Sequence, residues 1–360
     1  MSPLRTTRPR GQHQRGAALL VALLTVTLVA TFAAAALWQQ WRATEVEAAE
    51  RSRLQSAWVL VGALDWSRLI LREDALADAR IKAGASGSGA GESTKGPADH
   101  LGEPWAIPLA DVQLRDFLSA DQNVAAEQLE GLPEAFLSGS IVDAQSKLNV
   151  RNLVANGQPS AQAVAAFQKL FQLLGLPADQ VMTLVQGLLR VWPAAPPKTD
   201  GQGGEPPATA TAAAPDANAP LPPSRVQDLV WLGLPQSTVE AIRPYVTVLP
   251  VATTVNINTA SVEVLTASAD KLDMATAQRL VAHRQREYFD TLQMANALLP
   301  SGSAQLSSAM HNVSTQYFEV QGRLRLDRLW VQEQSLLHRN ANNLQVLWRD
   351  RGAGTDAPPP

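Results

Sequence analysis

Residues 16–38 decide the fold: they read GAALLVALLTVTLVATFAAAALW and contain no charged side chain. As an α-helix, the stretch from Ala17 to Trp38 is about 33 Å long, enough to cross the hydrocarbon core of a bilayer. Four arginines lie before it and three glutamates soon after it: Arg5, Arg8, Arg10 and Arg15, then Glu45, Glu47 and Glu50. By the positive-inside rule, this asymmetry predicts a single-pass protein with a cytoplasmic amino terminus and an exported body.

Two other interpretations of this stretch stay open. Ala33, Ala34 and Ala35 are small enough to form the cleavage site of a secretory signal, although the apolar core is unusually long for one. A buried helix of a soluble protein is the other alternative. Nothing polar enough to mark an outer face interrupts the run, which argues against it.

The composition of the whole chain excludes several classes of site. The 360 residues include no cysteine, so disulfides, cysteine-ligated zinc, iron–sulfur clusters and thiol catalysis are all excluded. The formal net charge of −3 argues against a general nucleic-acid binder. The length suits two to three domains of about 100–200 residues each.

The apolar run continues without a turn into an amphipathic segment. Leu54, Trp58, Val61 and Leu64 recur at helical spacing, which predicts a stripe that packs on a globular body. One long helix, half in the membrane and half on the body, is the simplest structure. Further along, 160–191 is expected to be helical with a break at 175–177, and TQYFEVQGRLRL and LQVLWRD are expected to be strands.

Caps are predicted at two helix starts. Ser224 precedes a short helix that is joined to a second one at Gly233, with Asp228 in its first turn. Asn258 or Thr259 precedes another helix, which is followed by a turn near 270–274. We expect the asparagines of this segment to act as local caps and turn formers.

Enzymatic and DNA-binding functions find little support. The five histidines are scattered and show no metal-ligand spacing such as H-E-x-x-H, so the chain is expected not to be an enzyme. The segment NINTA with its paired helices resembles a DNA-binding helix-hairpin-helix module. That module relies on a glycine-containing hairpin whose backbone amides reach phosphate. The hairpin here has no glycine and carries Asp273 in its turn.

The amino-terminal pattern resembles that of type IV pilin-like proteins, in which a basic leader ending in glycine precedes a hydrophobic helix. This resemblance implies that prepilin peptidase cuts between Gly16 and Ala17 and that the new amine is methylated. Pilins usually carry glutamate at the fifth mature position, where this chain has Val21. Because a buried glutamate needs a partner, its loss implies a subunit at the tip, with no subunit ahead of it to pair with.

Two further motifs make the resemblance more specific, to the minor pseudopilin K family of the type II secretion system. They are DxQxxxNxxNL, given by Asp143, Gln145, Asn149, Asn152 and Leu153, and NINTA, which includes Asn256, Asn258 and Thr259. The resemblance implies an α+β, type IV pilin-like fold with a long amino-terminal helix, a small antiparallel sheet and a large inserted helical domain similar to SAM or helix-hairpin-helix domains.

On this basis the chain divides as follows: leader 1–16, transmembrane half 17–38 and amphipathic half 39–82 of the first helix, flexible loop 83–104, first part of the body 105–150, inserted helical domain 151–310, strand-rich end of the body 311–350, and tail 351–360. Within the insertion, 193–223 is expected to be a disordered Pro/Ala-rich loop and 255–299 a two-helix unit.

The family also implies a calcium loop, with an acidic W-x-D-x-D pattern followed by Gly-Ala-Glu. Here the stretch from Trp192 reads WPAAPPKTDGQGGE, which leaves only Asp200 and Glu205 as weak candidate ligands. Six to eight oxygen ligands cannot come from two carboxylates, so calcium binding at this loop is expected to be weak or absent, and no other cofactor is expected.

The resemblance therefore implies a minor pseudopilin that forms or caps the pseudopilus tip and helps to initiate its assembly for export of folded proteins. Its partners would be the I- and J-type minor pseudopilins, the major pseudopilin, prepilin peptidase and the inner-membrane platform, with no nucleic acid. It would lie in the bacterial inner membrane, with its body in the periplasm. The alternative is a single-span periplasmic binding module that belongs to no filament.

Overall fold

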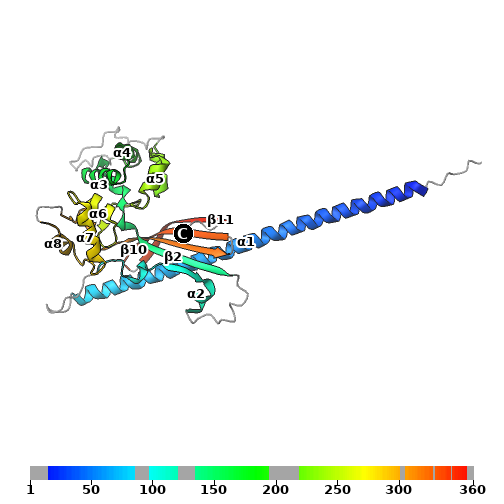
Figure 1. Cartoon of the computed structure of the whole chain (residues 1–360), viewed down its shortest axis with the longest axis horizontal. Coiled ribbons are helices and arrows are strands. Elements are labelled where there is room, and N and C mark those ends of the chain that lie inside the picture. The colour runs from blue at the N-terminus through cyan, green and yellow to red at the C-terminus, as the bar shows by residue number, and fades with distance from the viewer. Residues whose placement is uncertain are drawn as a thin grey trace, which may run out of the picture. The chain divides into compact units, whose positions relative to one another are not determined.

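The computed structural model describes residues 15–85, 97–120, 134–193, 219–300, 305–326, 329–341 and 343–354. The chain divides into two compact units, residues 1–59 and 60–360. Helix α1 (Arg15–Ala85) contributes residues to both of them (Figure 1).

In the first unit, the described residues form the amino-terminal part of α1. Its large apolar side chains, such as Leu19, Leu24 and Phe32, are exposed, as expected for a surface that meets lipid. The hydroxyl of Thr25 donates to the carbonyl of Ala22 at 2.8 Å, so a polar group in this stretch is satisfied within the helix. Among the described residues, α1 is the one helix long and apolar enough to span a membrane.

The second unit contains a five-stranded antiparallel sheet with the strand order β1-β2-β9-β10-β11. Its strands are β1 (Leu109–Gln113), β2 (Ala135–Asp143), β9 (Tyr317–Leu326), β10 (Leu329–Asn340) and β11 (Asn343–Gly354). The two segments expected to be strands lie in β9 and β11, which confirms that prediction. Around the sheet lie η1 (Pro104–Ala106) and α2 (Leu114–Ala120).

The last part of α1 lies along one face of the sheet (Figure 1). Leu64 and Leu71 of α1 form a core with Trp105, Phe318 and Leu337. The predicted stripe is therefore only partly right. Of its four members, Leu64 is buried and Val61 is half-buried, whereas Leu54 and Trp58 are exposed. The buried apolar side chains of α1 begin at Leu60 and recur at helical spacing from there.

A helical domain is inserted between β2 and β9. These strands are hydrogen-bonded neighbours whose ends pair at Asp143 and Phe318, so the domain leaves and re-enters the sheet at one place. Its helices are α3 (Ala161–Leu173), α4 (Asp179–Val191), η5 (Val226–Leu232), α5 (Gln236–Ile242), α6 (Val262–Ser268), α7 (Met274–Arg284) and α8 (Leu292–Ala297). They enclose a core of their own, which includes Phe167, Leu184 and Leu265.

Short strands and 3-10 helices connect this domain to the sheet. They are η3 (Ala144–Ser146), β3 (Leu148–Asn149), η4 (Val150–Leu153), β4 (Val154–Ala155), β5 (Gln158–Pro159), β6 (Val246–Thr247), β7 (Val255–Asn256) and β8 (His311–Asn312). Strands β3 and β6 pair in parallel, as do β7 and β8. The result is an α+β, type IV pilin-like fold that carries an inserted helical domain, as expected.

The predicted break between α3 and α4 is present, and Gly175 there has φ +68°, a conformation that favours glycine. Gly233 likewise joins η5 to α5, with φ +95°. The cap prediction for Ser224 is wrong. The N-cap of η5 is Arg225, and the Ser224 hydroxyl donates to the Asp228 carboxylate at 3.0 Å. The carboxylate is the stronger acceptor, so serine becomes the donor.

The cap prediction for α6 is also wrong. Ser261, not Asn258 or Thr259, is its N-cap, and the Ser261 hydroxyl accepts from the amide of Val264 at 3.3 Å. Asp273 caps α7 by accepting from the amide of Thr276 at 2.7 Å. Asn258 and Thr259 lie before the cap, and their side chains contact Phe289 and Asp143 respectively.

Candidate functional site

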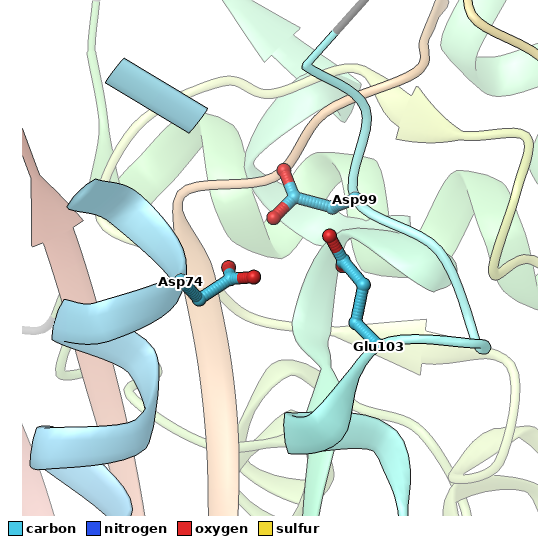
Figure 2. Close-up of side chains that lie close together, drawn as sticks. All are labelled: Asp74, Asp99 and Glu103. Atoms are coloured by element: carbon cyan, nitrogen blue, oxygen red, sulfur yellow. The ribbon is translucent and has the colours of Figure 1, made fainter. Parts of the chain in front are cut away.

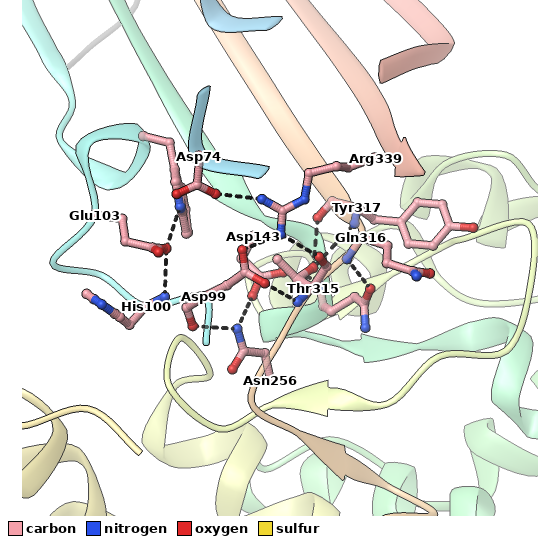
Figure 3. Close-up of polar contacts among 12 residues, drawn as sticks. Asp74, Asp99, His100, Glu103, Asp143, Asn256, Thr315, Gln316, Tyr317 and Arg339 are labelled. Atoms are coloured by element: carbon pink, nitrogen blue, oxygen red, sulfur yellow. Dashed lines mark hydrogen bonds and ion pairs between the residues drawn. The ribbon is translucent and has the colours of Figure 1, made fainter. Parts of the chain in front are cut away.

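The residues of the two family motifs converge where the helical domain joins the sheet. Asp143 ends β2 and is buried, with 1% of its surface exposed. One of its carboxylate oxygens accepts from the amide of Gln145 at 2.7 Å. The other accepts from Nδ2 of Asn256 at 2.9 Å and from the hydroxyl of Thr259 at 2.6 Å. We call Asp143, Gln145, Asn256 and Thr259 the junction network; Figure 3 labels Asp143 and Asn256.

Burial raises the pKa of Asp143 to about 6, and the hydrogen bond from Thr259 opposes that rise. The hydrogen bonds that the Asp143 carboxylate accepts come from neutral donors: a backbone amide, a side-chain amide and a hydroxyl. Such a buried group needs every donor it has, because an unpaired carboxylate in an apolar interior is costly.

Gln145 links two segments that enter the junction. Its Nε2 donates to the carbonyl of Thr254 at 3.0 Å, and its Oε1 accepts from the amide of Gln316 at 2.8 Å. Thr254 precedes β7, and Gln316 precedes β9. The side-chain amide of Gln145 thus connects the segment that leads into β7 with the segment that leads into β9.

Asn149 and Asn152 hold the segment 249–254. Nδ2 of Asn149 donates to the carbonyl of Val251 at 2.8 Å, and its Oδ1 accepts from the amide of Leu249 at 3.2 Å. Asn152 exchanges two hydrogen bonds with the backbone of Thr253, at 2.7 and 3.0 Å. An extended segment offers free backbone donors and acceptors, and asparagine can satisfy both kinds.

Asn256 and Asn258 also contact backbone groups of other segments. Asn256 donates to the carbonyl of Asp99 at 3.0 Å, besides its bond to Asp143. Asn258 exchanges two hydrogen bonds of 2.9 Å with the backbone of Phe289, in the loop after α7. The prediction that these asparagines act as local caps and turn formers is only partly right: Oδ1 of Asn256 accepts from the amide of Asn258 at 3.0 Å, but their other side-chain contacts are not local. They tie together segments that are far apart in the sequence.

A second polar cluster adjoins the junction network and was not predicted. It contains Asp74 of α1, Asp99 and Glu103 of the segment before η1, and Arg339 of β10. Figure 2 shows the three carboxyl groups pointing toward one another, and their nearest oxygens lie within 4.8 Å of one another. We call these four residues the acidic cluster.

Arg339 neutralises part of this charge. Its Nη1 donates to Asp74 at 2.6 Å, and its Nη2 donates to Asp99 and, at 2.9 Å, to the carbonyl of Thr315 (Figure 3). Glu103 accepts from the amide of His100 at 3.0 Å and from the indole of Trp105 at 2.7 Å. One cation thus faces three carboxyl groups.

Burial raises the pKa of Asp74 to about 6 and that of Glu103 to about 8. For Glu103 the nearby charges of Asp74 and Asp99 raise it further, and its hydrogen bonds oppose the rise. For Arg339, burial lowers the pKa, but Asp99 and Asp74 outweigh it, and the net direction is upward. The arginine is therefore charged, while Glu103 holds a proton near neutral pH.

The cluster fits a metal ion poorly, although three carboxyl groups lie close together. A calcium ion needs six to eight oxygen ligands, and here Arg339 already occupies two of the three carboxylates. The two candidate calcium ligands from the sequence, Asp200 and Glu205, lie outside the described residues. No metal centre is assigned to the part of the chain that the structure describes.

Residues Ala17 and Val21, expected at the processing site and at the position of the pilin glutamate, lie in the first turns of α1 and are exposed. Gly16 lies within the same helix, and residues 1–14 lie outside the described part of the chain.

A serine–histidine contact occurs in the helical domain, but it is structural. The Ser268 hydroxyl lies 3.0 Å from Nε2 of His311, and both residues are buried, with 4% and 2% exposure. Burial lowers the pKa of His311 to about 4. A substrate cannot reach a pair enclosed in this way.

Comparison with known proteins agrees with this geometry. Models described as type II secretion system (T2SS), protein K, match residues 146–251 and 255–315, which include Asn149, Asn256 and Thr259. The curated type II secretion system protein K of Pseudomonas aeruginosa is 28% identical to this chain, and the match covers 96% of this chain and 94% of that protein. The protein of the same name from Pectobacterium carotovorum is 27% identical, and the match covers 94% of this chain and 97% of that protein.

The fold is also similar to a solved structure, the GspK-GspI-GspJ complex of the enterotoxigenic Escherichia coli type 2 secretion system. The match has a TM-score of 0.52 and 18% identity, and it covers 84% of this chain and 98% of that chain. Family models, full-length relatives and fold thus agree with one another and with the motif residues at the junction. Along nearly its whole length the chain is thus similar to type II secretion system protein K, and these comparisons support the role of a minor pseudopilin anchored by one amino-terminal helix.

Proposed function

We propose that this subunit occupies the tip of the pseudopilus and helps to initiate its assembly for the export of folded proteins across the outer membrane. The observation that carries this proposal is the helical domain inserted between the paired strands β2 and β9. A domain with its own core, held to the sheet by a buried hydrogen-bond network, adds bulk that a repeating subunit in a filament would have to accommodate at every step.

Val21 supports the same position. A pilin-type glutamate in the membrane needs a partner, and valine at this position asks for none. A subunit without a neighbour ahead of it has no use for that glutamate. The tip is the place in a filament where one neighbour is absent.

The partners we propose are an I-type and a J-type minor pseudopilin, the major pseudopilin below them, and the inner-membrane platform. The solved relative is a complex with GspI and GspJ, which supports the first two. The basic leader and the acidic residues after the span support a cytoplasmic amino terminus and a periplasmic body. In this role the chain acts by assembly, without catalysis.

The amino terminus provides the decisive experiment. Intact-mass measurement on the membrane-extracted protein should show a chain that begins with methylated Ala17. Gly16→Leu should leave the leader in place and abolish secretion, whereas Gly11→Leu, in the same leader, should be processed normally. An unprocessed terminus, or one cut near Ala35, would favour the single-span binding module that belongs to no filament.

The partner proposal has its own test. The full chain, coexpressed with the I- and J-type minor pseudopilins of the same bacterium, should co-purify with both in equal amounts. A chain that purifies alone under these conditions would contradict the tip assignment. Incorporation at many positions along isolated pseudopili, seen with a single-site label, would contradict it as well.

A further inference from the structure

A cavity lies between α1 and the sheet in the second unit. It has a volume of about 280 Å³ and is lined by α1 from Leu60 to Ile70, by the segment around Trp105, and by β2, β9 and β10. Its walls are mostly apolar, with Leu64, Leu137 and Val320 among them. The cavity is distinct from the acidic cluster and from the junction network.

Two paired glycines lie on the floor of the cavity, beneath the helix. Gly139 of β2 pairs with Gly322 of β9, and Gly322 pairs in turn with Glu333 of β10. A Cβ on Gly322 would lie 3.3 Å from Cδ2 of Leu60, so the missing side chain is on the α1 side. The bare backbone of this pair is part of the cavity floor, and Leu60 packs closely over Gly322.

Two polar side chains enter this apolar space from β10. Ser335 has 1% of its surface exposed, and its hydroxyl has no hydrogen-bond partner among the described residues. Glu333 is 3% exposed and is paired with Arg349 and Arg351 of β11. Its Oε1 lies 3.0 Å from Nε of Arg349, but the contact lacks the geometry of a hydrogen bond.

An unsatisfied buried hydroxyl is a cost that a fold normally avoids, at about 1–3 kcal/mol. Here Ser335 lines a space that a ligand can enter. The size also fits a ligand, because an engineered apolar cavity of about 150 Å³ already binds benzene. A ligand of about ten heavy atoms with one polar end would fill the space and satisfy the hydroxyl.

We propose that this cavity is a binding site for a small neutral alcohol or phenol with an apolar body. The apolar part lies between α1 and the glycine floor, and its hydroxyl exchanges a hydrogen bond with Ser335. Glu333 provides a second acceptor on the same wall. This proposal goes beyond the assembly role and does not depend on it.

The test uses the full chain in lipid nanodiscs and two probes, 4-propylphenol and propylbenzene, which differ only by the hydroxyl. Ala63 lines the cavity, so Ala63→Leu should fill it, whereas Gly62, with nothing within 4 Å of its added Cβ, provides Gly62→Leu as the matched control. Titration calorimetry with Ala63→Leu in identical nanodiscs measures the heat of probe partition into lipid. This heat is subtracted from the heats measured with the other chains.

We expect a Kd below about 1 mM for 4-propylphenol, as a ligand of this size allows. Propylbenzene should bind at least about threefold more weakly, the effect of one hydrogen bond. Ser335→Ala should remove that difference by weakening only the phenol. Gly62→Leu should bind like the wild type.

Heats equal to those of Ala63→Leu for both probes would overturn the proposal. So would a preference for 4-propylphenol that survives Ser335→Ala unchanged, because the hydroxyl would then be recognised elsewhere. If Ala63→Leu fails to fold, as judged by circular dichroism, the comparison of the two probes on wild type and Ser335→Ala decides the question alone.

Discussion

Nδ2 of Asn256 donates a hydrogen bond of 2.9 Å to the carboxylate of Asp143, across 113 positions of sequence. Asp143 ends a strand of the sheet, and Asn256 lies in β7 of the inserted domain. The contact is buried on both sides. A buried polar contact of this kind fixes geometry, because no water is present to replace a lost partner.

Asn256→Ala should therefore lower the free energy of unfolding by about 2–4 kcal/mol, since it leaves the carbonyl of Asp99 and one carboxylate oxygen of Asp143 short of a donor. Urea unfolding of the full chain, followed by far-ultraviolet circular dichroism, measures the change. The exposed Asn343 provides the control, and Asn343→Ala should change stability by less than about 0.5 kcal/mol. Equal effects of the two variants would contradict the role of Asn256.

The acidic cluster predicts how stability depends on pH. The pKa of Glu103 is raised from 4.5 to about 8 in the folded chain, so the folded state binds a proton that the unfolded state has lost. The stability this contributes is full below pH 4.5 and is lost as the pH rises through about 8. Because Glu103 is partly exposed, we expect the loss to be on the order of 2 kcal/mol.

The body should accordingly melt at a lower temperature at pH 9 than at pH 6. Glu103→Gln keeps an acceptor for the indole of Trp105 but carries no charge, so it should flatten this dependence and melt higher than wild type at pH 9. Differential scanning calorimetry across this range provides the measurement. Glu263→Gln, on α6, is the control and should follow the wild-type curve. A lower melting temperature for Glu103→Gln at pH 9 would contradict the prediction.

Arg339 is the one cation of the acidic cluster. Arg339→Met would leave Asp74 and Asp99 close together without it, and removal of one partner from a buried ion pair costs about 3–5 kcal/mol. Adding Asp74→Asn to this variant should restore part of the stability, because one of the two uncompensated charges disappears. Urea unfolding measures the stability of both variants. Arg243→Met, at an exposed position, is the control and should change stability little. A double variant no more stable than Arg339→Met would argue against a charge-based role.

The amino-terminal helix and the strands of the sheet could be predicted from the sequence because their signals are local. An uncharged run from Gly16 to Trp38 identifies a span by itself, and alternating strands such as 317–326 show their period within a few residues. The motifs DxQxxxNxxNL and NINTA also drew attention to residues that form the junction network. Their mutual contacts, however, depend on pairing between segments about 100 positions apart.

The acidic cluster could not be predicted for the same reason. Asp74 and Arg339 are separated by 265 positions, and nothing near Asp74 distinguishes it from the exposed acids of an amphipathic helix. Only the folding of β10 against α1 brings them together. The predicted stripe failed at Leu54 and Trp58 because helical spacing defines a face without defining where the body begins to cover it.

The last prediction concerns calcium. The stretch after Trp192 has alanine and proline at Ala194 and Pro196, where the family pattern has aspartate, and two remaining carboxylates cannot supply six to eight oxygens. The melting temperature of the full chain in 1 mM calcium, a concentration on the order of the dissociation constants of weak extracellular sites, should therefore equal that in excess EDTA within about 1 °C. Ala194→Asp with Pro196→Asp should gain a calcium-dependent rise. A rise of several degrees in the wild type would show that other oxygens bind the ion, and an unresponsive double variant would show that aspartates at these two positions are not enough to rebuild the site.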